Sequence, residues 1–151
     1  MATIKHTFTI AAPPAKVYQA LSTLEGLADW WTADTTGNPK TGGKLRFAFE
    51  EDSNVMKVIR TEKNKFVAWR CIESSFIAGK EWLGTEVTFS LTTDEDKNTL
   101  VRFEHAKWKK ATDFYGVCTY HWGLFMTSLK ALCETGQGKP FGTKKDEVIA
   151  V

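Results

Sequence analysis

The sequence predicts an α+β fold, in which helices cover one face of a single antiparallel β-sheet. Three observations support this: apolar and polar residues alternate along much of residues 44–105, turn-forming residues separate the alternating segments, and one long amphipathic segment follows them. Alternation with a period of two is typical of a strand with one buried face, and strands joined by short loops pair antiparallel. The helical segments then cover that buried face.

The N-terminal part of the chain predicts one strand and two short helices. The strand covers Thr3–Ile10, where every second residue can face a core. Two prolines end it, and the second suits the first turn of a helix over Pro14–Ser22. A second short helix is expected over Leu24–Trp31, and a turn-rich segment, Thr32–Gly43, follows it.

Five further strands are expected between Lys44 and His105, which gives a sheet of about six strands. Four of them alternate clearly, whereas the run around Met56 and Val58 also has apolar residues on its other side, so the sequence leaves its facing open. The polar segment Asp94–Asn98 is typical of a hairpin loop. The residues predicted to point into the core are Leu45, Phe47, Phe49, Val67, Trp69, Val87, Phe89, Leu91, Val101 and Phe103.

The last predicted element is a long helix from Thr112 to Thr135. Thr112 is a suitable N-cap, and Gly136 is placed to end the helix. Its apolar stripe consists of Tyr115, Cys118, Trp122, Phe125, Leu129 and Leu132. At 1.5 Å per residue the helix is about 36 Å long. A domain of this size has a radius of gyration of about 15 Å, so the helix has to cross the whole molecule.

Length, charge and cysteine content exclude several classes of protein. The 151 residues suit one domain, and a net charge of +2 is too small to favour nucleic acid as a partner. No apolar run approaches the roughly 20 residues of a membrane span, and the N-terminus does not resemble a signal peptide. Three irregularly spaced cysteines are typical of reduced thiols. We therefore expect a cytoplasmic protein. The glycines, proline and charged residues of Gln137–Val151 predict a loose tail.

Several segments resemble a known superfamily. The START-like (Bet v 1-like, SRPBCC) superfamily has segments similar to Phe8–Leu21 and Leu27–Trp31. The ending, His121–Trp122 and Leu129–Phe141, specifically resembles its branch named after the Hsp90 ATPase activator homologues. The resemblance implies a helix-grip fold, in which a curved antiparallel sheet wraps around the C-terminal helix and leaves a deep apolar cavity. It places a domain at residues 1–141 and a C-terminal tail at 142–151.

Aromatic residues make up 13% of the chain, and many fall on the predicted inner faces. Together with the cavity that the resemblance implies, they favour a site for an apolar ligand. A fully packed core would use the same residues, since aromatic side chains dominate protein cores. The candidate ligand-binding residues are Trp31, Phe47, Phe49, Trp69, Phe89, Phe103, His105, Tyr115, Cys118, Trp122 and Phe125.

Other motifs give weaker support for catalytic, metal-binding or nucleic-acid-binding functions. His105 could serve as a polar anchor or an acid–base group, although a hydrogen-bonded core histidine is commoner. Cys118 and His121 are spaced as a metal-ligand pair or a nucleophile and its base, but no third ligand or orienting carboxylate accompanies them. Trp82, Trp108 and the lysines between residues 107 and 110 are expected at the cavity rim and in a solvated turn. We predict no metal, cofactor or catalytic residue.

The leading functional hypothesis is therefore non-enzymatic binding of a small hydrophobic or aromatic ligand, such as a lipid, polyketide or isoprenoid-like molecule. The superfamily also includes cyclases and chaperone regulators, and fold alone does not decide among them. The alternatives are a chaperone-regulating interaction module of the Hsp90 activator type and a cyclase- or hydrolase-like enzyme. A protein partner or a homodimer is also consistent with the sequence.

Overall fold

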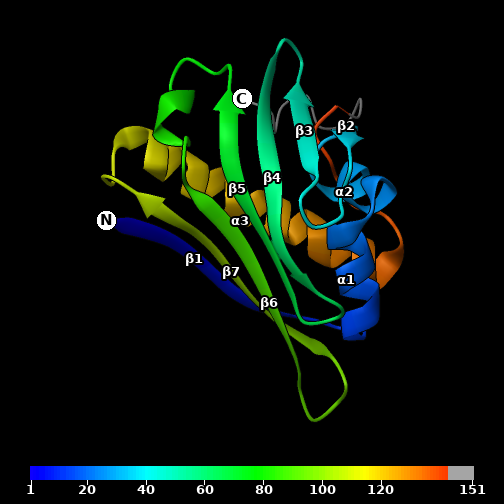
Figure 1. The fold of residues 1–151 in the computed structure, drawn as a ribbon. Helices are drawn as coiled ribbons and strands as arrows, with labels where there is room; N and C mark the ends of the chain where they lie inside the picture. Colours follow the sequence, from blue (N-terminus) through cyan, green and yellow to red (C-terminus); the bar gives the residue numbers. More distant parts are fainter. Residues whose placement is uncertain (143–151) are drawn as a thin grey trace.

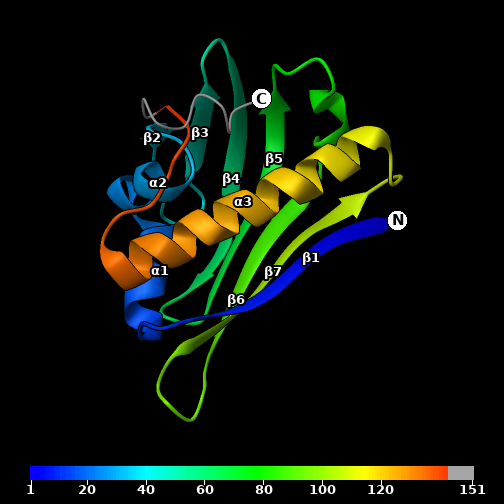
Figure 2. The same cartoon turned by 180° about the vertical axis from the view of Figure 1, so that it is seen from behind.

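A seven-stranded antiparallel sheet forms one layer of the molecule, and three helices lie against its concave face (Figures 1 and 2). The computed structural model describes residues 1–142. The elements are β1 (Ala2–Ile10), α1 (Pro14–Ser22), α2 (Leu24–Trp30), β2 (Asp34–Gly37), β3 (Lys44–Phe49), β4 (Asp52–Glu62), β5 (Phe66–Ser74), the 3₁₀ turn η1 (Gly79–Glu81), β6 (Glu86–Thr93), β7 (Thr99–Trp108) and α3 (Asp113–Thr135). The α+β helix-grip prediction is confirmed.

The strand order is β1-β7-β6-β5-β4-β3-β2, so the first strand pairs with the last one and every other neighbour follows in sequence. Short hairpin connections explain the antiparallel pairing. The inner-face residues predicted from alternation are buried, with the exception of Phe49, which is half-buried. Met56 and Val58 are also fully buried, which settles the facing that the sequence left open.

Helix α3 crosses the concave face of the sheet diagonally (Figure 2). Its ends agree with the prediction: the Thr112 hydroxyl accepts a hydrogen bond from the Tyr115 backbone N–H at 3.2 Å, and Gly136 adopts a left-handed φ of 88°. Near its C-terminal end, Lys130 Nζ donates to the Thr9 carbonyl oxygen at 2.6 Å, and the Glu134 carboxylate accepts from the Ala11 backbone N–H at 2.7 Å. Helix α3 is thus fastened to the end of β1.

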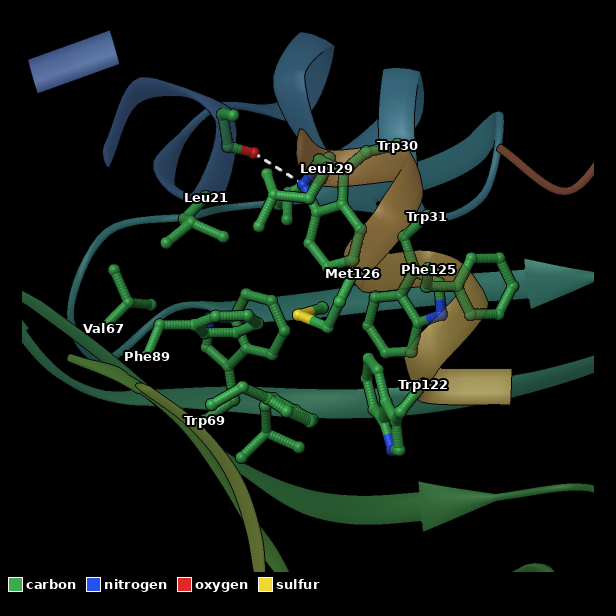
Figure 3. Packing of buried hydrophobic residues seen from close by; sticks show 14 of the residues in the cluster. Leu21, Trp30, Trp31, Val67, Trp69, Phe89, Trp122, Phe125, Met126 and Leu129 are labelled. Carbon is green, nitrogen blue, oxygen red and sulfur yellow. Dashed lines mark hydrogen bonds between the residues drawn. The ribbon is translucent and has the colours of Figure 1, made fainter. Parts of the chain in front are cut away.

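The half of the interior nearest α1 and α2 is closely packed (Figure 3). The rings of Trp31 and Trp69 are stacked, with centroids 5.8 Å apart and planes within 3° of each other. Trp30 is fully buried, and its indole Nε1 donates to the Ala20 carbonyl oxygen at 2.9 Å. The side chain of Met126 reaches from α3 into the middle of this cluster (Figure 3). This half of the molecule is a filled core.

Two expectations about irregular segments are wrong. The turn-rich segment contains strand β2, which pairs with β3 and adds a seventh strand. Its four residues, Asp34–Gly37, have no apolar alternation because the strand lies at the sheet edge and is largely exposed. The beginning of the expected loose tail is also ordered, since the Phe141 N–H donates to the Trp31 carbonyl oxygen at 2.8 Å. Residues 143–151 of the predicted tail lie outside the described residues.

Within residues 1–142, no helix combines the length and the hydropathy that a bilayer span requires.

The contact between α1 and α2 supplies a stability prediction. A Cβ atom on Gly26 would lie 2.6 Å from the Ala20 Cα atom, because the two helix backbones touch there. We expect Gly26→Ala to lower the free energy of unfolding by about 1–3 kcal/mol. Gly116→Ala is the matched control: a Cβ there meets nothing within 4 Å, and the change should raise this free energy by about 0.5–1 kcal/mol. Urea denaturation measures both, and equal effects would contradict the prediction.

Candidate functional site

A cavity of about 250 Å³ lies between the N-terminal half of α3 and the sheet, and it is partly open to solvent. Strands β3, β4 and β5, the β5–β6 connection and α3 all contribute to its wall. Its lining residues are mostly apolar: Trp31, Phe49, Asn54, Ser74, Phe76, Gly79, Trp82, Phe114, Val117, Cys118, His121, Trp122, Phe125 and Phe141. A concave apolar site with a few polar groups is typical of small-molecule binding.

The predicted site residues divide into two groups. Five of them line the cavity: Trp31, Phe49, Cys118, Trp122 and Phe125. The others are Phe47, Trp69, Phe89, Phe103, His105 and Tyr115, and none of these lines it. The four sheet aromatics in this second group pack in the filled half, where Trp69 and Phe89 contact each other edge-to-face at 5.3 Å. Phe49 and these four aromatics lie on the same inner face of the sheet, so alternation alone could not separate them.

His105 lies behind the cavity wall, fully buried on β7. Its Nδ1 atom accepts a hydrogen bond from the Trp122 indole N–H at 3.0 Å, and its Nε2 atom lies 2.7 Å from the Thr85 hydroxyl. An indole nitrogen can only donate, so Nδ1 is unprotonated and Nε2 carries the hydrogen. The Thr85 hydroxyl in turn donates to the Trp82 carbonyl oxygen at 2.6 Å.

The hydrogen bonds continue through Trp82 and return to α3. The Trp82 indole Nε1 donates to Cys118 Sγ at 3.4 Å, and Cys118 lies one turn before Trp122 on the helix. We call this closed set, which consists of Trp122, His105, Thr85, Trp82 and Cys118, the polar ring. Burial lowers the pKa of His105 to about 3, so the imidazole is neutral. With both nitrogens engaged, His105 has no free atom for proton exchange with a ligand.

Sequence reasoning missed several lining residues. Trp82 was expected at the rim and does line the cavity, whereas Trp108, the last residue of β7, is buried and does not. Phe76 lies in the β5–β6 connection, whose facing no periodicity reveals. Phe114 and Val117 lie on α3, four residues before Cys118 and His121 respectively, a helical spacing that could have found them. Phe141 reaches the cavity because the chain after α3 folds back along the end of α2.

One corner of the cavity is polar. Asn54 on β4 and Ser74 on β5 are paired across the two strands, and the Ser74 hydroxyl donates to Asn54 Oδ1 at 2.6 Å. Asn54 shares the inward parity of Met56 and Val58, a signal that could have found it. We call Asn54 and Ser74 the polar corner.

The Cys118 and His121 pair does line the cavity, as neighbours one turn apart on α3. Burial is the main cause that raises the pKa of the Cys118 thiol to about 11, so the thiol is protonated and a poor nucleophile. Among the described residues no group of three or more His, Cys, Asp or Glu side chains could hold a metal ion.

A family comparison agrees with this geometry. The family model described as Activator of Hsp90 ATPase homolog 1-like protein matches residues 11–134. The chain belongs to this family. The Activator of Hsp90 ATPase homolog 1-like match includes both short helices, the sheet from β2 to β7 and nearly all of α3, so it covers every lining residue of the cavity except Phe141. A search of curated proteins gave no match.

Solved structures of related proteins have the same architecture. The Aha1 dimer from Colwellia psychrerythraea is 38% identical, with a TM-score of 0.79 over 91% of this chain and 100% of that one. A structural-genomics protein from Mesorhizobium loti is 21% identical, with a TM-score of 0.74 over 87% and 96% of the two chains. CalU16 from Micromonospora echinospora is 17% identical, with a TM-score of 0.71 over 98% and 81%. The last two support the fold alone.

The buried, neutral His105 generates a pH prediction. An unfolded histidine has a pKa near 6.5, whereas the pKa of His105 in the folded protein is about 3. Between these values only the unfolded chain binds the proton. The free energy of unfolding should therefore fall as the pH drops below 6.5, by up to about 1.4 kcal/mol per pH unit from this group.

The test compares urea denaturation between pH 7 and pH 5. His105→Gln should be less stable than the wild type at pH 7 and should show a shallower loss towards pH 5. His121→Gln makes the same replacement outside the polar ring and controls for the loss of one histidine side chain. A His105→Gln protein with the full wild-type slope would contradict the assignment.

Proposed function

We propose that this protein binds a small hydrophobic or aromatic ligand in the cavity between α3 and the sheet. The observation that carries the proposal is the uneven interior: the half next to α1 and α2 is filled, whereas the half next to the start of α3 is hollow and apolar. An apolar hollow of this size in an otherwise close-packed interior is typical of a ligand site. Lipid, polyketide and isoprenoid-like fragments are the classes that such a lining favours.

The size of the cavity limits the ligand. Its volume of about 250 Å³ is slightly below the range of roughly 300–1,000 Å³ that is usual for drug-sized ligands. A cavity of about 150 Å³ suffices for a single benzene ring. A molecule of about two fused rings, or a branched chain of similar bulk, is therefore the best match.

The walls favour flat, apolar molecules. The rings of Trp82 and Trp122 lie nearly parallel, with an interplanar angle of 15° and centroids 6.0 Å apart. The ring centroids of Trp31 and Trp122 are 4.9 Å apart. Together with Trp82, three indoles from different parts of the chain border the cavity. Aromatic faces and edges interact well with a flat ring system. The exposed Val117 lines the outer part of the cavity, where a ligand can enter from solvent.

The arrangement favours binding over catalysis. His105, the residue with which an enzymatic mechanism would begin, has both ring nitrogens bonded inside the polar ring. The Cys118 thiol accepts a hydrogen bond and has a raised pKa. Three free and buried cysteines, Cys71, Cys118 and Cys133, support our proposal of a cytoplasmic, reducing location.

The probe for this proposal is tetralin, a bicyclic hydrocarbon, titrated into ¹⁵N-labelled protein and followed by NMR. We expect saturable shifts that centre on the lining residues, including the indole N–H signals of Trp82 and Trp122. Val117→Trp should weaken tetralin binding about tenfold or more, because the larger side chain occupies the outer cavity. Tyr120→Trp is the matched control on the same helix, since Tyr120 is exposed and does not line the cavity. It should bind tetralin like the wild type.

Two outcomes would count against ligand binding. One is a wild-type protein with no saturable shifts at the lining residues. The other is a Val117→Trp protein that binds tetralin as tightly as the wild type. Native mass spectrometry of freshly purified protein then measures the mass of any small molecule that co-purifies.

A chaperone-regulating interaction module is the second candidate function. The observation that favours it is the 38% identity to Aha1 from Colwellia psychrerythraea, together with the family description. Because that relative is a dimer, we also propose that this chain forms a homodimer. Sedimentation velocity should then show a species at about twice the chain mass of 17.0 kDa. A single species at the monomer mass would overturn the dimer, and an Hsp90 ATPase rate unchanged by the added protein would overturn the chaperone role.

A further inference from the structure

The polar corner of the cavity points to one feature of the ligand. Asn54 is only 4% exposed and yet lines the cavity. Its Oδ1 atom accepts a hydrogen bond from the Ser74 hydroxyl, whereas its carboxamide nitrogen makes no hydrogen bond within residues 1–142. Among the described residues, the only side-chain nitrogen or oxygen that is both enclosed and unpaired is Trp108 Nε1. The Asn54 carboxamide nitrogen therefore keeps some accessible surface, and the space next to it is the cavity.

The corner is built by an irregularity in the sheet. Along β5 the inward residues are Val67, Trp69 and Cys71, so strict alternation would next place Glu73 inward. The β4–β5 register shifts between Val55 and Met56, and this leaves one residue of β5 unpaired. After the shift, Ser74 lies opposite Asn54. Bulges of this kind re-aim side chains next to functional sites.

The turn above the corner is fitted closely to it. A Cβ atom on Gly79 would lie 2.0 Å from Ser74 Oγ, so only glycine permits η1 to sit on the Ser74 side chain. Gly79, Ser74 and Asn54 all line the cavity. With its oxygen held by Ser74, the Asn54 carboxamide keeps one orientation, and its N–H groups remain the donors available to a ligand.

We propose that the bound ligand carries a hydrogen-bond-accepting oxygen, as in a ketone, quinone or ester, and that the Asn54 carboxamide nitrogen donates to it. This inference rests on the proposed function, since it names the ligand class of the same cavity. The aromatic walls hold the ring system, and the polar corner orients it. A buried donor that is unpaired among the described residues discriminates well between a ligand that supplies an acceptor and one that does not.

The experiment compares two probes that differ only in a carbonyl group: tetralin and 1-tetralone. Both are titrated by NMR into the wild type and into Asn54→Leu, which removes the carboxamide at nearly constant volume. We expect the affinity for 1-tetralone relative to tetralin to fall about five- to tenfold in Asn54→Leu, with tetralin binding nearly unchanged. This is the effect of one neutral hydrogen bond. Asn98→Leu makes the same replacement in the β6–β7 loop and should leave the ratio at the wild-type value.

Ser74→Ala provides a second variant in case Asn54→Leu folds poorly. It keeps the carboxamide but frees its orientation, so it should lower the same ratio by a smaller factor. An unchanged ratio in both variants, with tetralin still bound, would overturn the assignment of Asn54 and leave cavity binding intact. Absence of tetralin binding in the wild type would overturn both proposals.

Discussion

The polar ring through Trp122, His105, Thr85, Trp82 and Cys118 is the constraint on which the functional half of the molecule depends. Each hydrogen-bonding group in it is buried, so each needs a partner. Only one register of α3 against β7 places the Trp122 indole on His105 and the Cys118 thiol on Trp82 at the same time. The ring thereby fixes the position of the helix, and it holds the indoles of Trp82 and Trp122 where they line the cavity. His105 has a structural role, because both of its ring nitrogens are hydrogen-bonded and neither is free for acid–base chemistry.

One half of the aromatic interior is filled, and the other half is hollow. Met126 and Leu129, on the second half of α3, pack in one cluster with Trp30, Trp69 and Phe89 (Figure 3). Beside the first half of the helix, the hydrogen bonds of the polar ring hold the indoles of Trp82 and Trp122 in place. These side chains are not free to collapse inward, so the space beside them persists. Rigid walls of this kind reduce the ordering that a ligand has to impose when it binds.

Prediction from sequence succeeded where a single periodicity was enough. The period-two runs identified the buried faces of the strands, and the caps Thr112 and Gly136 identified both ends of α3. It failed where pairing partners decide the outcome. Asp34–Gly37 becomes a strand only because β3 offers it an edge, and Phe141 is ordered by hydrogen bonds to Trp31 and Ala33. No local pattern in those segments encodes such distant partners, and the propensity of a strand depends strongly on them.

The polar corner shows why the ligand-binding residues are harder to predict than the fold. Asn54 follows the inward parity of its strand, so the sequence places it on the core face, but a lone asparagine there is indistinguishable from one that is fully hydrogen-bonded. Ser74 has the outward parity and faces the cavity only after the register shift in β5. A one-residue change of register moves a side chain to the opposite face of a sheet. The register shift makes the corner unpredictable from sequence, and it also creates the corner. It brings the Ser74 hydroxyl to the Asn54 oxygen, and the amide nitrogen is left facing the cavity.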